Sequence, residues 1–306
     1  MHMPKSRMIS ATMDSPVGLW SHTRGRSKTV FLTALVFPVF AVPIVFLRCW
    51  TSHVILGKWH LDDTLAVISL VFALGQSIMH CIQSRLGGGD HVSNISPAGL
   101  SLLLKTGKYA AGPFYNLTTF FTKASVLAFY LRFSVQRSFH FCVYALTVIV
   151  GAYSITNIIT VLVLDCHDRE ACHIIYLIFD VTAALNIAAD IAILLLPFWI
   201  LHPMTISAGR KFAIALVLMA GGFVVAVSIV RLVATIIVDN DPDPTYSWGL
   251  TILLSLIESW AGLICACLPC LMPFWARYFP NFTLRRFSLE RNQRQLRSIG
   301  TSGSAA

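Results

Sequence analysis

Residues 191–200 read IAILLLPFWI, ten successive residues without a polar side chain. A membrane β-strand of about this length alternates in polarity, because one face meets lipid and the other meets the barrel interior. This stretch is apolar on every face, and the α-helix is the other form that satisfies its own backbone inside a bilayer. Residues 191–200 therefore predict a membrane-spanning helix.

Six more apolar stretches lie around this one, and each has the roughly 20 residues that a spanning helix needs. The whole chain is 56% hydrophobic and 12% charged, whereas soluble domains carry about 25% charged residues. We predict an all-α polytopic membrane protein, a seven-transmembrane-helix bundle. The expected helices are residues 29–47, 64–84, 109–133, 139–164, 174–201, 211–238 and 248–275.

This segmentation gives three parts, namely an N-terminal tail of residues 1–28, a membrane domain of residues 29–276 and a basic tail of residues 277–306. The first part lacks the compact apolar core of a cleavable signal peptide, so the first helix is expected to act as the signal anchor. The net charge of +9 favours contact with anionic membrane lipid, and we expect no nucleic-acid partner.

Basic residues predict the orientation of the bundle. Arg132 and Arg137 follow the third helix, Arg210 and Lys211 follow the fifth, and six arginines follow the seventh. The loops after the fourth and sixth helices are acidic instead. The positive-inside rule then places the N-terminus outside and the C-terminus in the cytoplasm. We expect the protein in the plasma membrane or the endoplasmic reticulum. The five basic residues among the first 28 argue for the inverted topology.

Five ionisable residues lie inside the predicted helices: Lys123, Asp180, Asp190, Arg231 and Glu258. A charge at the bilayer centre costs at least about 2.5 to 3.5 kcal/mol, so such residues face the bundle interior and pair. Counting 1.5 Å per residue puts Lys123 and Asp190 at similar depth near the membrane middle. We predict that these two pair, and that Arg231 pairs with Glu258 or Asp180.

Asn186 and Ser228 share helical faces with the predicted charges and are expected to join them in one polar network. The network is a candidate binding site for a small lipophilic molecule. Three carboxylates against two cations leave one acid over, and Asp190 and Glu258 are the candidates for a catalytic acid. The alternative is that all five ionisable residues only lock helix packing.

Cysteine placement predicts one disulfide. Six of the eight cysteines lie in or beside apolar helices and are expected to be free thiols. Cys166 and Cys172 sit in the loop after the fourth helix, on the predicted outer face, where oxidation is permitted. We predict a disulfide between them, and glycosylation of Asn94 in the sequon Asn94-Ile95-Ser96.

Neither a metal nor a cofactor is expected. The histidines beside Cys166 and Cys172 do not give a strong zinc motif. The adjacent Asp62 and Asp63 resemble metal-diphosphate ligands, but acids at this place more often cap the N-terminus of a helix.

Several short motifs together carry a resemblance to a known family. They are Leu61-Asp62-Asp63, the loop Gly87-Gly88-Gly89-Asp90-His91, Lys123-Ala124-Ser125 with Phe129-Tyr130-Leu131-Arg132, Asn186 with Asp190 and Pro197, Lys211 with Gly222, Ser228 and Arg231, Glu258, and Cys267-Leu268-Pro269. From about Arg48 to Pro273 the chain resembles the fungal rhodopsin-domain family. The resemblance implies a fungal, receptor-like seven-helix protein, and several relatives are encoded in secondary-metabolite clusters. It implies no particular reaction.

A retinal chromophore is not expected, because a rhodopsin needs a lysine on its seventh helix and residues 248–275 contain none. Lys123 is better explained as an ion-pair partner. Coupling to a G protein is left open, since Leu131-Arg132-Phe133 replaces the acidic-Arg-aromatic signature of animal receptors and Asn-Pro-x-x-Tyr is absent from the seventh helix.

Two functions remain. In the first, the protein is a receptor that senses a small molecule or supports a secondary-metabolite pathway. In the second, it is a membrane-embedded enzyme in which the surplus acid protonates a lipophilic intermediate to start a cyclisation or isomerisation.

Overall fold

A computed structural model describes residues 26–91, 95–132, 136–164, 169–201, 208–238 and 244–271, with Phe274 and Tyr278. Its α-helices are α1 (Arg26–Trp50), α2 (Leu61–Arg85), α3 (Pro97–Thr106), α4 (Gly112–Leu131), α5 (Arg137–Val163), α6 (Arg169–Leu201), α7 (Ala208–Val238) and α8 (Pro244–Cys267). Three short helical segments continue them: η3 (Thr51–Ile55) after α1, η5 (Gly107–Ala111) between α3 and α4, and η6 (Leu268–Leu271) after α8. The predicted glycosylation site Asn94 and the predicted disulfide of Cys166 with the Cys172 side chain lie outside the described residues.

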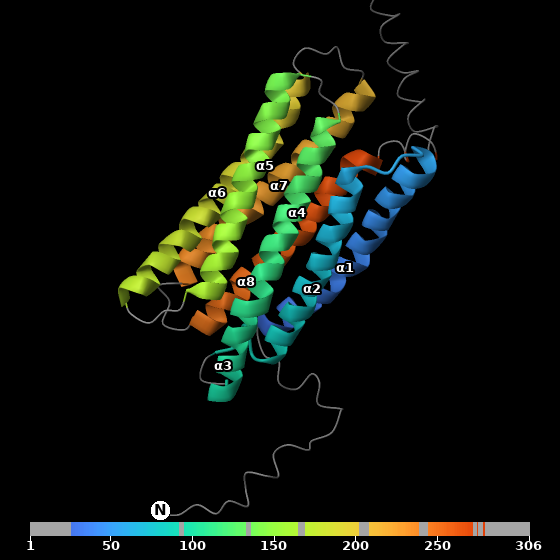
Figure 1. Cartoon of the computed structure of the whole chain (residues 1–306). Helices are drawn as coiled ribbons and strands as arrows, with labels where there is room; N and C mark the ends of the chain where they lie inside the picture. The colour runs from blue at the N-terminus through green and yellow to red at the C-terminus, as the bar shows by residue number, and fades with distance from the viewer. Residues whose placement is uncertain are drawn as a thin grey trace, which may run out of the picture.

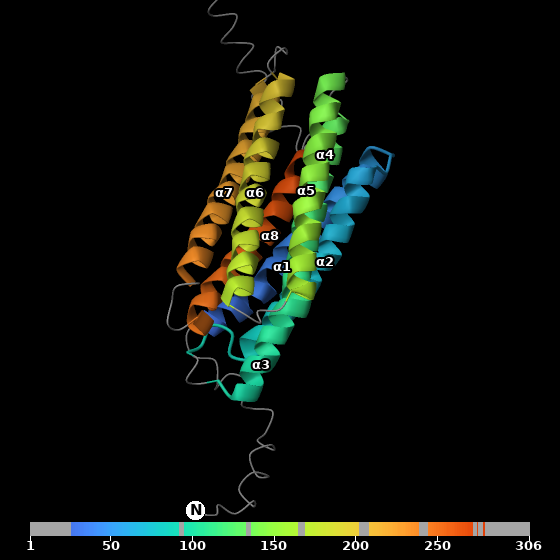
Figure 2. The ribbon, with the colours of Figure 1, turned by 60° about the vertical axis from the view of Figure 1, so that its left-hand side comes forward.

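The helices run alongside one another as a single bundle, with α3 projecting at one end (Figures 1 and 2). We call the end at which α1 begins, near Arg26, the proximal end, and the end at which α1 finishes, near Trp50, the distal end. The described residues form no β-strand, and the predicted all-α polytopic membrane fold is confirmed. The six helical cysteines are free thiols, as predicted.

Six of the helical rods are long and apolar enough to cross a membrane, and they contain α1, α2, α5, α6, α7 and α8. The outward faces of these rods carry exposed apolar side chains such as Val39, Phe46 and Val148, which suit contact with lipid. The remaining rod, α3–η5–α4, is more polar. Within it, α4 contacts α2, α5, α6 and α8, and the buried polar side chains of α4 face these helices.

Local sequence explains where helices begin. Ser96 is the N-cap of α3, its hydroxyl accepts from the Gly99 N–H at 3.1 Å, and Pro97 occupies the first turn. The third rod therefore begins at Pro97, twelve residues before the predicted start at Tyr109. At the start of α2, Asp63 Oδ2 accepts from the His60 N–H at 3.3 Å, which confirms the predicted capping role.

The triple-glycine loop closes the proximal end. Gly87 and Gly89 have φ values of +96° and +101°, which residues with a Cβ rarely adopt. Gly249, in the first turns of α8, lies so close to this loop that a Cβ on it would come within 2.7 Å of the Gly89 Cα. Glycine at these positions lets α8 pack against the loop after α2.

Candidate functional site

Glu258 of α8 is the centre of a buried polar cluster at mid-bundle. Its Oε2 accepts from Arg231 Nε at 2.6 Å and from the Tyr115 hydroxyl at 3.0 Å. Its Oε1 accepts from Ser228 Oγ at 2.7 Å and from Asn186 Nδ2 at 2.9 Å. Four donors, one of them a guanidinium, match an ionised carboxylate, which only accepts hydrogen bonds.

Lys123 of α4 is a second centre, next to the first. Its Nζ lies 2.9 Å from Asp190 Oδ1 and donates to Asn186 Oδ1 at 2.8 Å and to the Asn186 backbone oxygen at 2.9 Å. The Tyr153 hydroxyl lies 3.2 Å from the same ammonium and 3.1 Å from Asn186 Oδ1. Four oxygens thus lie within 3.2 Å of the ammonium, and they compensate its charge in a membrane interior.

Asn186 and Ser228 join the two centres. The Asn186 side chain accepts from Lys123 and donates to Glu258, while Ser228 Oγ lies 2.7 Å from Glu258 and 3.4 Å from Asp190. We call these eight residues, contributed by α4, α5, α6, α7 and α8, the central network: Tyr115, Lys123, Tyr153, Asn186, Asp190, Ser228, Arg231 and Glu258. Its two cations balance its two carboxylates.

Helical spacing positions these side chains. Asn186 and Asp190 are four residues apart on α6, and Ser228 and Arg231 are three apart on α7, so each pair lies on one helical face. Tyr115 and Lys123 are two turns apart on α4. The Arg231 guanidinium also lies 5.1 Å from the Tyr115 ring centroid, a cation–π contact that fixes both side chains.

Six of the seven residues predicted as a polar network meet in this cluster. The predicted pair Lys123–Asp190 is present, and Arg231 selects Glu258 from its two predicted partners. Asp180 stays apart, and no described residue forms an ion pair with it. The surplus carboxylate of the charge count is therefore Asp180, whereas both predicted catalytic candidates, Asp190 and Glu258, are paired with cations.

Sequence reasoning missed the tyrosines of the network, Tyr115 and Tyr153, and the amide of Asn157. Asn116 Nδ2 donates to Asn157 Oδ1 at 2.9 Å, and Asn157 Nδ2 donates to Thr182 Oγ1 at 2.9 Å, which connects α4, α5 and α6. A tyrosine on an apolar helix gives little signal, because its ring counts as hydrophobic. Asn157 was the detectable one, since an amide in a spanning helix needs a partner.

A second buried charge cluster lies at the distal end and was also missed. Arg48, which is fully buried in α1, donates from Nη2 to Asp62 Oδ2 at 2.9 Å and from Nε to Asp63 Oδ1 at 3.1 Å. Its Nη1 donates to the Ala266 backbone oxygen at 2.9 Å. Arg132, partly exposed after α4, lies 3.7 Å from Asp62 Oδ1. This distal cluster joins α1, α2, α8 and the end of α4, and its charges also balance.

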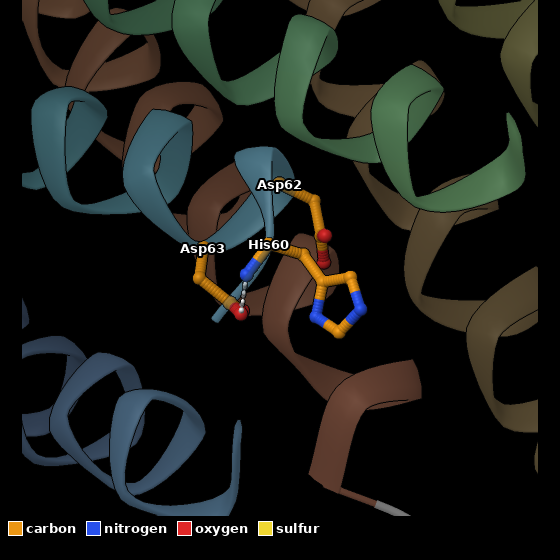
Figure 3. A group of neighbouring side chains, drawn as sticks. All are labelled: His60, Asp62 and Asp63. Atoms are coloured by element: carbon orange, nitrogen blue, oxygen red, sulfur yellow. Dashed lines mark hydrogen bonds between the residues drawn. The ribbon is translucent and has the colours of Figure 1, made fainter. Parts of the chain in front are cut away.

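His60, Asp62 and Asp63 are close enough to suggest a metal site, because one ligand atom from each lies within 4.8 Å of the others. Figure 3 shows the His60 ring beside the Asp62 carboxylate, while the Asp63 carboxylate turns to the His60 backbone N–H. A divalent ion would have to displace the Arg48 guanidinium from both carboxylates. The donor set therefore fits the arginine that occupies it better than a metal.

A cavity of about 650 Å³ lies on the proximal side of the central network. Most of its walls are apolar, including Leu103 and Leu104 of α3 and Ile252 of α8, and the π-helical segment η5 forms one side. Tyr115 lines the cavity and also donates to Glu258. Its volume lies within the roughly 300 to 1,000 Å³ of small-molecule sites. A second space of about 80 Å³ on the distal side is lined by Lys123 and Asp190.

Comparisons with known proteins agree with this architecture. A SAT4 family membrane protein of Emericella nidulans is 28% identical to the chain over 204 residues, 63% of this chain and 51% of that protein. The chain thus spans about half the length of this curated relative. No solved structure matches it. Residues 47–277 match the fungal rhodopsin domain, a range that contains both charge clusters and the cavity. The chain therefore belongs to the fungal rhodopsin domain family of multi-pass membrane proteins.

Proposed function

We propose that this protein is a receptor-like membrane protein that binds a small lipophilic molecule in the cavity of the proximal half, which we call the proximal cavity. Binding there changes the hydrogen bonds of the central network. The proposal rests on Tyr115, because its side chain both lines the cavity and donates a hydrogen bond to Glu258. A molecule that shifts Tyr115 changes the donor set of a carboxylate on which α4, α6, α7 and α8 converge.

The energetics favour a switch of this kind. A buried carboxylate that loses one of its donors is destabilised by about 1 to 3 kcal/mol, enough to change the ratio of two bundle conformations by about fivefold to more than a hundredfold. A ligand shifts such an equilibrium only by its differential affinity for the two states. A ligand that contacts and shifts Tyr115 provides this difference in affinity, because the shifted hydroxyl can no longer donate to Glu258.

In the predicted orientation the proximal end is extracytoplasmic, so the cavity samples molecules outside the cytoplasm or in the outer leaflet. Leu104 and Leu164, at the cavity wall, are about 40% exposed, which offers a lipophilic ligand an apolar entrance. The resemblance to proteins from secondary-metabolite clusters makes fungal secondary metabolites the first compounds to test.

The enzyme alternative has less support. It needs an acid that is protonated and faces substrate, and both candidate acids instead face cations. Glu258 is further saturated by three neutral donors. No described feature favours acid-initiated chemistry over ligand binding.

Occupancy is tested by filling the cavity. Compounds that raise the thermal unfolding temperature of the purified protein in nanodiscs are expected to bind the variant Leu104→Trp at least about tenfold more weakly, because the indole displaces ligand atoms from apolar contact. The matched control is Leu102→Trp, an exposed position on α3 that does not line the cavity. Equal loss in both variants, or in neither, contradicts binding in this cavity.

Transmission is tested by removing one hydroxyl. In Tyr115→Phe the ring stays over Arg231 but the bond to Glu258 is already lost, so a cavity ligand no longer has to break it and is expected to bind at least as tightly as it binds the wild type. Hydrogen exchange of α7 peptides around Ser228–Arg231, outside the cavity, should respond to that ligand in the wild type and not in the variant. Tyr109→Phe, at an exposed tyrosine, is the control. A preserved α7 response in Tyr115→Phe would exclude this route.

A further inference from the structure

Two polar atoms beside the proximal cavity have no hydrogen-bond partner in the part of the chain that the structure describes. They are His80 Nε2 on α2 and Thr251 Oγ1 on α8, both buried, and both residues line the cavity. The His80 side chain is 96% buried, since its relative exposure is 4%. Most buried polar atoms in proteins are hydrogen-bonded, so two unpaired ones beside a single cavity indicate that a polar group of a ligand binds between them.

His80 and Thr251 lie at similar depth on two helices that contact each other. Gln76 Nε2 of α2 lies 3.5 Å from the Ser255 backbone oxygen of α8, and these two helices are antiparallel. His80 follows Gln76 by four residues and Thr251 precedes Ser255 by four, so both stand about one helical turn nearer the proximal end than that contact. One ligand group between α2 and α8 can therefore meet both.

The hydrogen-bond partner of His80 Nδ1 determines whether the unpaired Nε2 is a donor or an acceptor. His80 Nδ1 lies 2.7 Å from Gln83 Oε1, and an amide oxygen only accepts, so Nδ1 carries the proton. None of the described residues that line the cavity is a carboxylate, whereas Lys108 is among them, so a second proton on the ring would place a further cation beside Lys108 without a described anion. The ring is neutral, and Nε2 presents a lone pair.

The ligand group must therefore donate to His80 Nε2 and accept from the Thr251 hydroxyl. A hydroxyl group does both with one oxygen, and the apolar walls suit a hydrocarbon body. Building on the proposed function, we infer that the proximal cavity selects a lipophilic alcohol, whose hydroxyl lies between His80 and Thr251.

The test uses two photoreactive probes, a diazirine-bearing hexadecanol and its methyl ether, with the full chain in nanodiscs and mass-spectrometric mapping of the labelled residues. The alcohol is expected to label cavity residues with half-saturation at about threefold to tenfold lower concentration than the ether, the value of one hydrogen bond. Excess unlabelled hexadecanol should compete.

Three variants assign the two contacts. His80→Phe is expected to bring the alcohol-to-ether ratio to about one, because only the alcohol donates to Nε2. Thr251→Val removes a hydroxyl that has no partner among the described residues, so it should fold normally and weaken both probes about threefold. Ser255→Ala is the matched control, since the Ser255 hydroxyl lines the same cavity but already donates to the Thr251 backbone oxygen. It should change neither probe.

The outcomes separate this inference from the proposed function. Cavity labelling with equal half-saturation for alcohol and ether overturns the alcohol assignment and leaves a cavity that binds small molecules. Stronger labelling by the matching diazirine hexadecanoic acid overturns it in favour of an acid. Labelling confined to lipid-facing residues, unaffected by Leu104→Trp, defeats the proposed binding function itself.

Discussion

Glu258→Gln is expected to lower the free energy of unfolding by about 3 to 5 kcal/mol, the cost of breaking a buried ion pair by removing one partner. The amide has nearly the shape of the carboxylate, so the effect comes from charge. Arg231 would keep its full charge in the bundle without an anion, since Asp190 is held by Lys123. The measurement is denaturant or thermal unfolding of the purified protein in nanodiscs, together with its folded yield.

Two further variants make this result specific. Asp180→Asn removes a carboxylate from the same membrane domain that pairs with no described residue, and it should change stability by less than about 1 kcal/mol. Adding Arg231→Gln to Glu258→Gln should restore part of the loss, because the uncompensated cation is then gone, and the double-mutant cycle should show coupling. If Glu258→Gln and Asp180→Asn lower the free energy of unfolding equally, the charge of Glu258 does not stabilise the central network.

Arg48→Met should have an effect of similar or larger size, because it leaves two buried carboxylates, Asp62 and Asp63, at the distal end. Only Arg132 remains near Asp62, at 3.7 Å, and no other described cation pairs with Asp63. A loss of about 3 to 5 kcal/mol is expected, visible as a collapse of folded yield after purification. Arg48→Lys should rescue little, since one ammonium cannot reach Asp62, Asp63 and the Ala266 oxygen together.

Arg132→Met is the matched control, since it removes another arginine from the same Asp62. Its side chain is 31% exposed and its contact is long, so a change below about 1 kcal/mol is expected. A similar yield for Arg48→Met and Arg132→Met would mean that the distal cluster does not hold α1 to α2.

The central network was largely predictable because charges in a spanning helix have few solutions. Depth counting placed Lys123 opposite Asp190, and the need for an anion placed Arg231 beside Glu258 or Asp180. The choice of Glu258 depends on rotation of α6 relative to α7, which no local pattern in the sequence encodes. The assignment of these residues to ligand binding stays a prediction.

Arg48 was missed for a physical reason. An arginine near the end of a spanning helix usually extends to the headgroup region, and it then needs no partner. Here the adjacent acids after a short loop were the signal, since two carboxylates at the start of α2 exceed what capping requires. The proximal cavity could not be predicted, because the π-helical segment η5 forms one side of it and no local pattern in the sequence indicates a π-helix at Gly107–Ala111.

The polarity of α4 has a consequence for how the chain is made. By hydropathy α4 is not among the candidate spans, and its lysine finds its nearest amide partner, Asn186, 63 residues later in the sequence. At a synthesis rate of about 5 to 20 residues per second, Lys123 leaves the ribosome roughly 3 to 13 s before that partner. The α2 helix, which already contacts α4 through Ser69 and Thr122, is the earlier-made neighbour able to hold it meanwhile. Biogenesis of this bundle is thus a matter of timing, in which half-made chains carry an unneutralised cation until α6 arrives.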